Sequence, residues 1–406
     1  MPGHGNVVIA QSGGPTAVIN RTLAGAINEL KALRMGARIL GAKHGIDGIM
    51  DKDFLQLDSV SGPLMRKVAE MPGAALGSTR RKPSPEDCEK ILRVFWDMNV
   101  RYFFYIGGDD TARALSIIAK SAEEAKQPLV CIHIPKTIDN DLVKPHDHAP
   151  GWGSAARFVA LSSMGLDEDN RSMRGIYINV FMGKNAGFLT ASTALARERD
   201  DEGPHLLYLP EVEFKEEKFI QDIQTVYDEL GRVHVAVSEG ISVKDESGGL
   251  TPLIQVMQQG HGSDNFGGVN LSGSGALGDY LGRLVKKSVK PKEGHHVRVR
   301  SDTMGYLQRS FPFVVSEVDA EEAELVGRMG VQYAFDEEKN ASIALIRKDS
   351  DHYECETIAA SLELVGSGKR MMPKEFISSD GTDITQEFVD YATPIIGSMP
   401  RRARLL

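Results

Sequence analysis

The chain has 406 residues, of which 41% are hydrophobic and 25% charged, and this balance excludes collagen-like and wholly disordered proteins. Its 47 basic and 56 acidic side chains give a formal net charge of −9, which argues against proteins that bind nucleic acids or anionic membranes. No apolar run approaches the ~20 residues of a membrane-spanning helix. The N-terminus has no signal core and the cysteines show no CxxC spacing, so we expect a cytoplasmic protein with reduced thiols and two or three domains.

Short apolar runs alternate with helical patterns along the chain. The first run, 6–10, predicts a buried parallel strand, and a glycine turn and a helix with Thr16 as its N-cap follow it. Further strands are predicted at 102–106, 129–134, 176–181, 206–209 and 233–237. Strands that alternate with helices predict an α/β protein whose open, mostly parallel sheets carry helices on both faces.

Three turns at the ends of predicted strands are the candidate ligand sites: 12–16, 107–111 and 135–141. Open α/β sheets bind ligands where strands end and helices begin. The glycine pairs Gly13–Gly14 and Gly107–Gly108 would let backbone N–H groups approach a phosphate. A tight turn without a ligand would also explain them.

Two adjacent carboxylates, Asp109 and Asp110, follow the second glycine pair. Beside a phosphate, they need a divalent cation or a strong base to balance their charge. Asp109 is the candidate Mg²⁺ ligand, because hard cations prefer carboxylate oxygen. The alternative is a pair of residues that cap a helix.

The third turn combines one cation with carboxylates: Lys136, Thr137, Asp139 and Asp141. A lysine can neutralise transferring phosphoryl oxygens, and an aspartate can accept the proton of an attacking hydroxyl. The turn therefore indicates phosphoryl transfer, with a solvated loop and an internal ion pair as the alternative.

Two other patterns indicate less. Residues 273–278 match GxGxxG, but a poor strand precedes them, so we interpret them as a turn that opens a helix. His146 and His148 lack the context of a zinc motif, and we interpret them as ordinary polar loop histidines.

Six motifs in order give the chain a family resemblance: SGGPTAVIN at 12–20, GGDDT at 107–111, PKTIDND at 135–141, MGKNAG at 182–187, YLPEVEF at 208–214 and MGYLQR at 304–309. With these, the chain resembles the phosphofructokinase family, and its pyrophosphate-dependent branch most of all. The resemblance implies two Rossmann-like three-layer α/β/α domains with mostly parallel sheets. It implies that the domain that binds the phosphoryl donor consists of residues 1–149 plus about 309–355. The domain that binds the sugar phosphate would consist of residues 150–308 plus a C-terminal extension at about 356–406.

The resemblance also implies residue roles. Asp139 matches the general base, with Mg²⁺ on Asp109, and Lys136, Asp110 and Thr137 complete the catalytic set. The diphosphate is expected beside Gly13, Gly14, Arg80, Gly108, Asp110 and Lys136. Fructose 6-phosphate is expected at Thr137, Ile138, Asp139, Asp141, Met182, Gly183, Lys184, Glu211, Arg300, Tyr306 and Arg309. In that set, Glu211 meets sugar hydroxyls and the last three residues hold the 6-phosphate. Since the family shares its sugar site between subunits, we expect a homodimer or homotetramer.

The phosphoryl donor is inferred from two positions. ATP-using members of the family carry glycine where this chain has Asp110 and Lys136. A carboxylate ~4 Å from the continuing phosphates of ATP would cost about 4 kcal/mol at an effective dielectric near 20, and Lys136 would offset it beside pyrophosphate. We therefore expect a reversible transfer in glycolysis and gluconeogenesis. The alternatives are an ATP-dependent 6-phosphofructokinase, a silent sugar-phosphate-binding regulatory subunit, and a lipid or NAD kinase.

Overall fold

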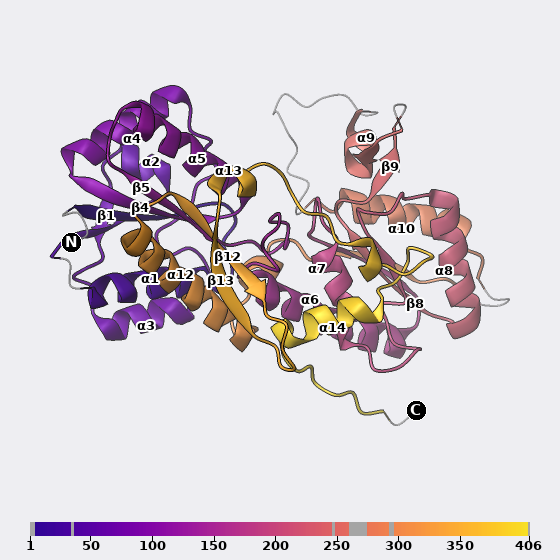
Figure 1. Cartoon of the computed structure of the whole chain (residues 1–406). Helices are drawn as coiled ribbons and strands as arrows, with labels where there is room; N and C mark the ends of the chain where they lie inside the picture. Colours follow the sequence, from indigo (N-terminus) through magenta and orange to yellow (C-terminus); the bar gives the residue numbers. More distant parts are fainter. Residues whose placement is uncertain (1–4, 34–35, 246–247, 260–273, 292–295, 405–406) are drawn as a thin grey trace. The chain divides into compact units, whose positions relative to one another are not determined.

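The computed structural model describes residues 5–33, 36–245, 248–259, 274–291 and 296–404 (Figure 1). The chain divides into two compact units. The first unit consists of Met1–Ser154 and Arg309–Arg370, and the second of Ala155–Gln308 and Met371–Leu406. In the described residues, no helix has the length and apolar character needed to cross a lipid bilayer.

A seven-stranded sheet forms the centre of the first unit, in the order β13-β12-β5-β4-β1-β2-β3. The five inner strands run parallel, and the two edge strands, β3 and β13, are antiparallel to their neighbours. The strands are β1 (Asn6–Gln11), β2 (Ile39–Ala42), β3 (Phe54–Gln56), β4 (Val100–Gly107), β5 (Val130–Pro135), β12 (Ala341–Arg347) and β13 (Cys355–Ala360).

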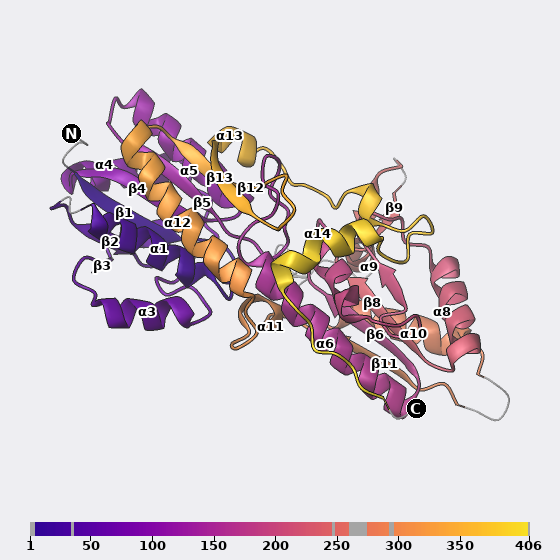
Figure 2. The same cartoon turned by 60° about the horizontal axis from the view of Figure 1, so that its bottom comes forward.

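Helices cover both faces of this sheet because successive strand residues point to opposite sides. Val7 and Ile9 enter one hydrophobic core, whereas Val8 and Ala10 enter the other. The first core is covered by α1 (Ile19–Ala32), α3 (Gly62–Glu70) and α12 (Glu317–Glu337), and Figure 2 shows α1 lying beside α12. The second is covered by α2 (Ile46–Met50), α4 (Pro85–Asp97), α5 (Asp109–Glu124) and the short α13 (Leu362–Val365).

The second unit contains a four-stranded parallel sheet in the order β11-β6-β8-β7. Its strands are β6 (Ile176–Phe181), β7 (Leu206–Tyr208), β8 (Val233–Ser238) and β11 (Val299–Thr303). The helices α8 (Glu216–Leu230) and α10 (Ala276–Ser288) pack on one face, against Ile178 and Val235. The other elements are α6 (Trp152–Met173), α7 (Phe188–Ala191), η1 (Ser192–Ala196), β9 (Ser242–Lys244), β10 (Leu250–Pro252), α9 (Leu253–Gln259), α11 (Leu307–Ser310), η2 (Lys374–Phe376) and α14 (Gln386–Ile396).

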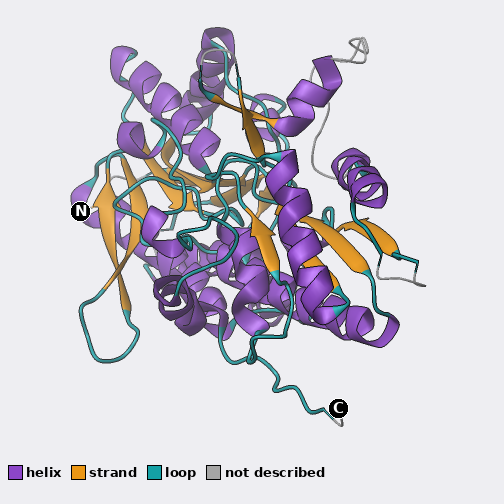
Figure 3. Ribbon diagram, turned by 90° about the vertical axis from the view of Figure 1, so that its right-hand side faces the viewer, coloured by secondary structure: helices purple, strands orange, loops and turns teal. Residues whose placement is uncertain are grey.

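Beyond α14 the chain continues as a loop, drawn in teal in Figure 3. Two arginines near its end form ion pairs with buried acids of the second unit. Arg402 lies 2.7 Å from Asp167 and Arg404 lies 2.6 Å from Glu202. The C-terminal extension is thus tied to the second unit by charge.

The predicted fold class is confirmed: the chain is mixed α/β with mostly parallel sheets. The predicted cap of the first helix is wrong. Val18 is the N-cap, and the Thr16 hydroxyl instead accepts a hydrogen bond from the N–H of Val18 at 3.3 Å. The last segment of the first unit ends at Arg370 rather than near 355, because β13 pairs with β12 and α13 packs against α5.

The structure also describes parts of two weaker sequence patterns, the GxGxxG stretch and the two histidines. A helix does begin at Ala276, within the GxGxxG stretch, while Gly273 lies outside the described residues. His146 and His148 lie in a loop, as interpreted from the sequence, and the structure adds that both side chains are buried.

Candidate active site

The three glycine- and charge-rich turns lie at the carboxyl ends of β1, β4 and β5, which are adjacent parallel strands. The register aligns these ends, since Gln11 pairs with Ile106 and Gly107 pairs with Pro135. Residues from three distant parts of the sequence therefore meet at one edge of the sheet. This is the place where open parallel sheets bind their ligands.

The first turn lets two cations approach the backbone closely. Gly13 has a φ of +77°, and a Cβ built there would lie 3.0 Å from the Nζ of Lys136. A Cβ on Gly14 would lie 3.2 Å from the Nε of Arg309. The Nζ of Lys136 donates a hydrogen bond to the carbonyl of Gly14 at 2.7 Å. Larger residues at either glycine would crowd these positive groups.

Lys136 is only 4% exposed, and its surroundings disfavour its charge. Burial and then the positive charges of Arg309 and Arg80 lower the pKa of Lys136 to about 7. Arg80 itself is exposed to solvent. A buried lysine among other cations would be stabilised in its charged form by a bound anion.

Asp109 and Asp110 have different environments, although they are neighbours. Asp109 is buried at the start of α5; burial raises the pKa of its carboxyl, and the nearby charge of Lys369 opposes that rise. Asp110 is exposed and forms an ion pair with Lys82 at 3.4 Å. The N-cap of the helix is Gly108, so the two aspartates do not form the capping pair considered from the sequence.

The third turn is folded around Thr137. Its hydroxyl accepts a hydrogen bond from the N–H of Asp139 and donates one to the carboxylate of Asp141, both at 3.1 Å. Ile138 is buried, Asp139 is half-buried, and Asn140 has a left-handed φ of +54°. The loop is thus ordered by internal bonds and presents the Asp139 side chain near the surface of the unit.

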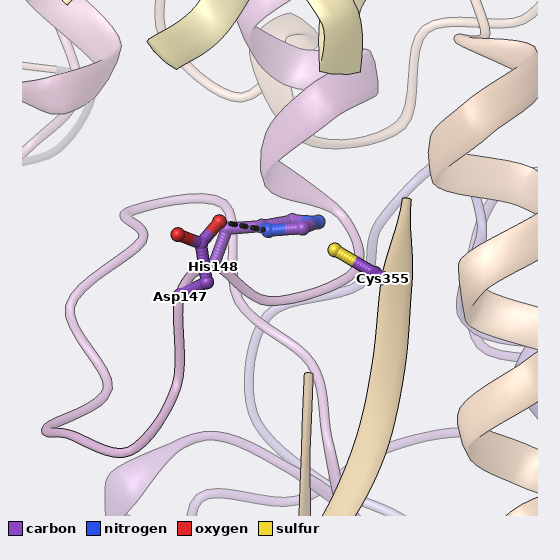
Figure 4. Close-up of side chains that lie close together, drawn as sticks. All are labelled: Asp147, His148 and Cys355. Atoms are coloured by element: carbon purple, nitrogen blue, oxygen red, sulfur yellow. Dashed lines mark hydrogen bonds and ion pairs between the residues drawn. The ribbon is translucent and has the colours of Figure 1, made fainter. Parts of the chain in front are cut away.

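A buried network of charged side chains lies next to the loop that carries Asp139. The N–H of Thr137 donates to the carbonyl of Pro150, in the segment that carries His148. The His148 ring lies 2.8 Å from Asp147 and 2.6 Å from Glu322, and Figure 4 shows it with Asp147 and Cys355. Burial alone would lower the pKa of His148, but the charge of Glu322 and the hydrogen bonds to both acids raise it to about 9. Both ring nitrogens have acidic partners, so this cluster is a structural ion network.

The second unit orders the residues around Met182 in a similar way. The N–H of Met182 donates to the side chain of Gln308 at 3.1 Å, and the carbonyl of Gly183 accepts a hydrogen bond from Ser238 at 2.8 Å. Gly183 has a φ of +125°, which favours glycine. Lys184 is exposed to solvent.

Only one of the two carboxylate oxygens of Glu211 accepts hydrogen bonds within the described part of the chain. One oxygen accepts hydrogen bonds from the N–H groups of Gly187 at 2.9 Å and Met372 at 2.8 Å. Its other oxygen has no hydrogen-bond partner within the described part of the chain. Burial raises the pKa of the carboxyl despite these two donors. The second carboxylate oxygen of Glu211 can therefore accept a hydrogen bond from the hydroxyl group of a ligand.

The residues expected around the 6-phosphate are distributed over both units. Arg300 lies on β11 opposite Tyr177, and both Arg300 and Tyr306 are exposed in the second unit. Arg309 begins the last segment of the first unit, where it lies against Gly14.

The sequence model of the family described as phosphofructokinase matches residues 6–328. This chain belongs to the phosphofructokinase family. It is 46% identical over 402 residues to the pyrophosphate–fructose 6-phosphate 1-phosphotransferase of Rhodospirillum rubrum, with 99% of this chain and 96% of that protein covered. The protein of that name from Xanthomonas campestris is 34% identical over 403 residues, with 97% and 92% covered.

A solved structure agrees with these sequence matches. The pyrophosphate-dependent phosphofructokinase of Nitrosospira multiformis superimposes with a TM-score of 0.83 at 29% identity, covering 100% of this chain and 95% of that one. The comparisons confirm the resemblance to the pyrophosphate-dependent branch that the motifs indicated.

The sequence analysis missed two residues that contact the candidate site. Lys369 lies 3.1 Å from Asp141 and 3.8 Å from Asp109. Arg370 donates hydrogen bonds to backbone carbonyls of the loop that follows Asp139. Both residues follow the region matched by the family model, and no motif marks them.

Proposed function

We propose that this chain transfers a phosphoryl group reversibly from pyrophosphate to the 1-hydroxyl of fructose 6-phosphate, giving fructose 1,6-bisphosphate and phosphate. The observation that carries the proposal is the buried Lys136, whose ammonium lies against Gly14 at the end of β1. ATP-using relatives are expected to have glycine at this position. The names of the two relatives described above support the same donor.

The charges around Lys136 favour a short, highly charged donor. Its ammonium has lost most of its hydration and lies near Arg80 and Arg309, so a polyanion gains strongly by binding there. Asp110 stands at the exposed start of α5. Its carboxylate would repel the α-phosphate of a nucleotide and would leave the two phosphoryl groups of pyrophosphate on the cationic side.

The transfer itself requires a base and a set of fixed positive charges. Asp139 accepts the proton of the sugar 1-hydroxyl. The Thr137 hydroxyl orients Asp139 by accepting a hydrogen bond from the Asp139 N–H. Lys136 and Arg80 offset the charge that develops on the transferring group and on the leaving phosphate. Fixed charges of this kind act without reorganisation at the moment of reaction.

The carboxylates of Asp109 and Asp141 fit a divalent cation. They are hard oxygen donors, and the ammonium of Lys369 lies within 4 Å of both, which marks the place between them as one that favours positive charge. Mg²⁺ held there, with Asp109 as its principal ligand, would supply neutralisation of the donor oxygens.

For the acceptor we propose the residues that the family resemblance implies. Glu211 offers its unpaired oxygen to a sugar hydroxyl, and Met182, Gly183 and Lys184 contribute the adjoining surface. Arg300, Tyr306 and Arg309 provide donors for the 6-phosphate. We also propose a homodimer or homotetramer in the cytoplasm.

A donor-by-acceptor activity matrix tests this function. The purified protein is assayed with Mg²⁺ and pyrophosphate or ATP, against fructose 6-phosphate or sedoheptulose 7-phosphate. We expect turnover with pyrophosphate and fructose 6-phosphate in both directions, and little with ATP. Turnover with ATP alone would identify an ATP-dependent enzyme. Binding of fructose 6-phosphate without any turnover would identify a silent regulatory subunit.

A further inference from the structure

The last segment of the first unit, residues 361–370, returns to the candidate active site. After β13 it forms α13, whose Leu362 and Val365 are buried. The guanidinium of Arg113, one turn along α5 from Asp109, donates a hydrogen bond to the carbonyl of Gly366 at 2.9 Å. A Cβ on Gly366 would lie 2.9 Å from the Arg113 backbone, so the two segments are in close contact. The segment is therefore fixed to the helix that carries Asp109.

Arg370 fixes the same segment to the loop that carries Asp139. Its backbone N–H donates to the carbonyl of Asp141 at 2.8 Å. Its guanidinium donates to the carbonyls of Asn140 at 3.0 Å and Asp147 at 2.7 Å. The contact with Asn140 holds a residue of left-handed backbone conformation, next to the proposed base.

Between these two anchors, Lys369 reaches the buried carboxylates. Its Nζ lies 3.1 Å from Asp141, whose side chain is 4% exposed, and 3.8 Å from Asp109, whose side chain is 12% exposed. Two carboxylates in such a dry place disfavour each other's charge unless a cation is present.

We propose that Lys369 is a resident counter-ion of the divalent-cation site, which competes with a metal ion for Asp109 and Asp141. It is a positioning residue: its ammonium holds the two carboxylates together before a metal binds, and it lowers their affinity for the free ion. This inference rests on the proposed function only for the location of the metal site.

With Lys369 in this place, the site should bind a divalent ion together with pyrophosphate rather than the free ion alone. A free divalent ion must displace an ammonium already held by two carboxylates, which weakens its binding. A metal–pyrophosphate complex keeps a net negative charge, because the diphosphate carries more charge than the divalent ion, and Lys369 can approach the diphosphate oxygens once it leaves the carboxylates. The lysine thus disfavours metal binding without the donor.

The test measures the binding of Mn²⁺ alone, without substrates, from the electron paramagnetic resonance signal of the free ion at pH 7 and constant ionic strength. For Lys369→Met, we expect Mn²⁺ to bind about tenfold more tightly than to the wild type, because its competitor is gone. Lys369→Arg should stay within about twofold of the wild type. An unchanged or weaker affinity in Lys369→Met would overturn the proposal.

Two further variants make the result specific. Lys120→Met removes an ion pair of 2.6 Å with Glu363 on the same segment and touches neither carboxylate, so it should leave Mn²⁺ affinity unchanged. In an Asp109→Asn background, Lys369→Met should lose its effect. If that effect persists, the tighter ion binds elsewhere and the proposal fails. Should Lys369→Met not fold, Lys369→Gln replaces it with the same expectation.

These measurements contain no phosphoryl donor and no sugar. Their failure is therefore distinguishable from failure of the proposed function, which the donor-by-acceptor matrix tests separately.

Discussion

The two units prepare their candidate functional residues in different ways. In the first unit, the buried carboxylates of Asp109 and Asp141 contact the ammonium of the more exposed Lys369, and the buried Lys136 contacts the backbone of Gly14. In the second unit, Lys184, Arg300 and Tyr306 are exposed to solvent. Buried fixed charges favour catalysis, because they need no reorganisation, whereas exposed side chains suit binding. We therefore expect changes in the first unit to affect turnover and changes in the second to affect substrate affinity.

The largest effect is expected at Asp139. Replacement by alanine removes the proton acceptor and should lower kcat about 10³-fold, while the KM for fructose 6-phosphate changes little. Steady-state kinetics in both directions check this, with Asp139→Asn as a variant of nearly the same shape. If alanine instead raised KM and left kcat intact, Asp139 would be a binding residue and the contrast between the units would fail.

The next largest effect concerns the donor. The double variant Asp110→Gly with Lys136→Gly should lower kcat/KM for pyrophosphate about 100-fold, since it removes a buried cation from the phosphate site, and it should admit ATP. The assay compares both donors at saturating fructose 6-phosphate. Lys82→Ala, which removes only the exposed partner of Asp110, serves as the control and should behave like the wild type.

A smaller effect is expected in the second unit. Glu211→Gln keeps the shape of the side chain but replaces an oxygen acceptor, so the KM for fructose 6-phosphate should rise about tenfold with kcat nearly unchanged. Glu213→Gln is the matched control two residues along the chain, because its carboxylate pairs with Lys215 and Lys244 on the surface. A fall in kcat alone would place Glu211 among the catalytic groups.

The smallest effect on catalysis is expected from the network around His148, which should act on stability. The pKa of His148 is raised to about 9 in the folded chain from an ordinary value of 6.5, so its contribution is complete below pH 6.5 and is lost as the pH rises through 9. Between pH 6.5 and 9, the thermal unfolding midpoint of the wild type should fall by more than that of His148→Gln. The difference should be equivalent to about 3 kcal/mol. Parallel curves would show that the imidazole is not charged.

The sequence allowed the parallel sheets and the three turns of the first unit to be predicted, because the relevant signals are local. The strand at 176–181 was predicted with the bounds that it has, and the turns after β1, β4 and β5 meet as expected. Thr16 was a plausible cap by residue type, but the chain bends at Ala17 and Val18 before the helix begins at Ile19. Local patterns do not determine where a turn ends.

Lys369 could not be predicted from such patterns. It reaches Asp109 and Asp141 only because β13 pairs antiparallel with β12 and α13 packs on α5. Similarly, the His148 ring lies 2.6 Å from Glu322, which is distant in the sequence. Contacts between remote segments arise from tertiary packing, and a pattern within a few residues carries no information about them.

The course of the chain after residue 355 limits how this enzyme can be shortened. A fragment ending at 328, where the family match stops, would retain all six motifs but would lack Lys369, Arg370 and the N–H of Met372 that holds Glu211. Removal of only the last few residues would already take away Arg402, the partner of Asp167. The six motifs alone are thus not enough to form the candidate site, and a shortened chain has to keep its carboxyl-terminal extension.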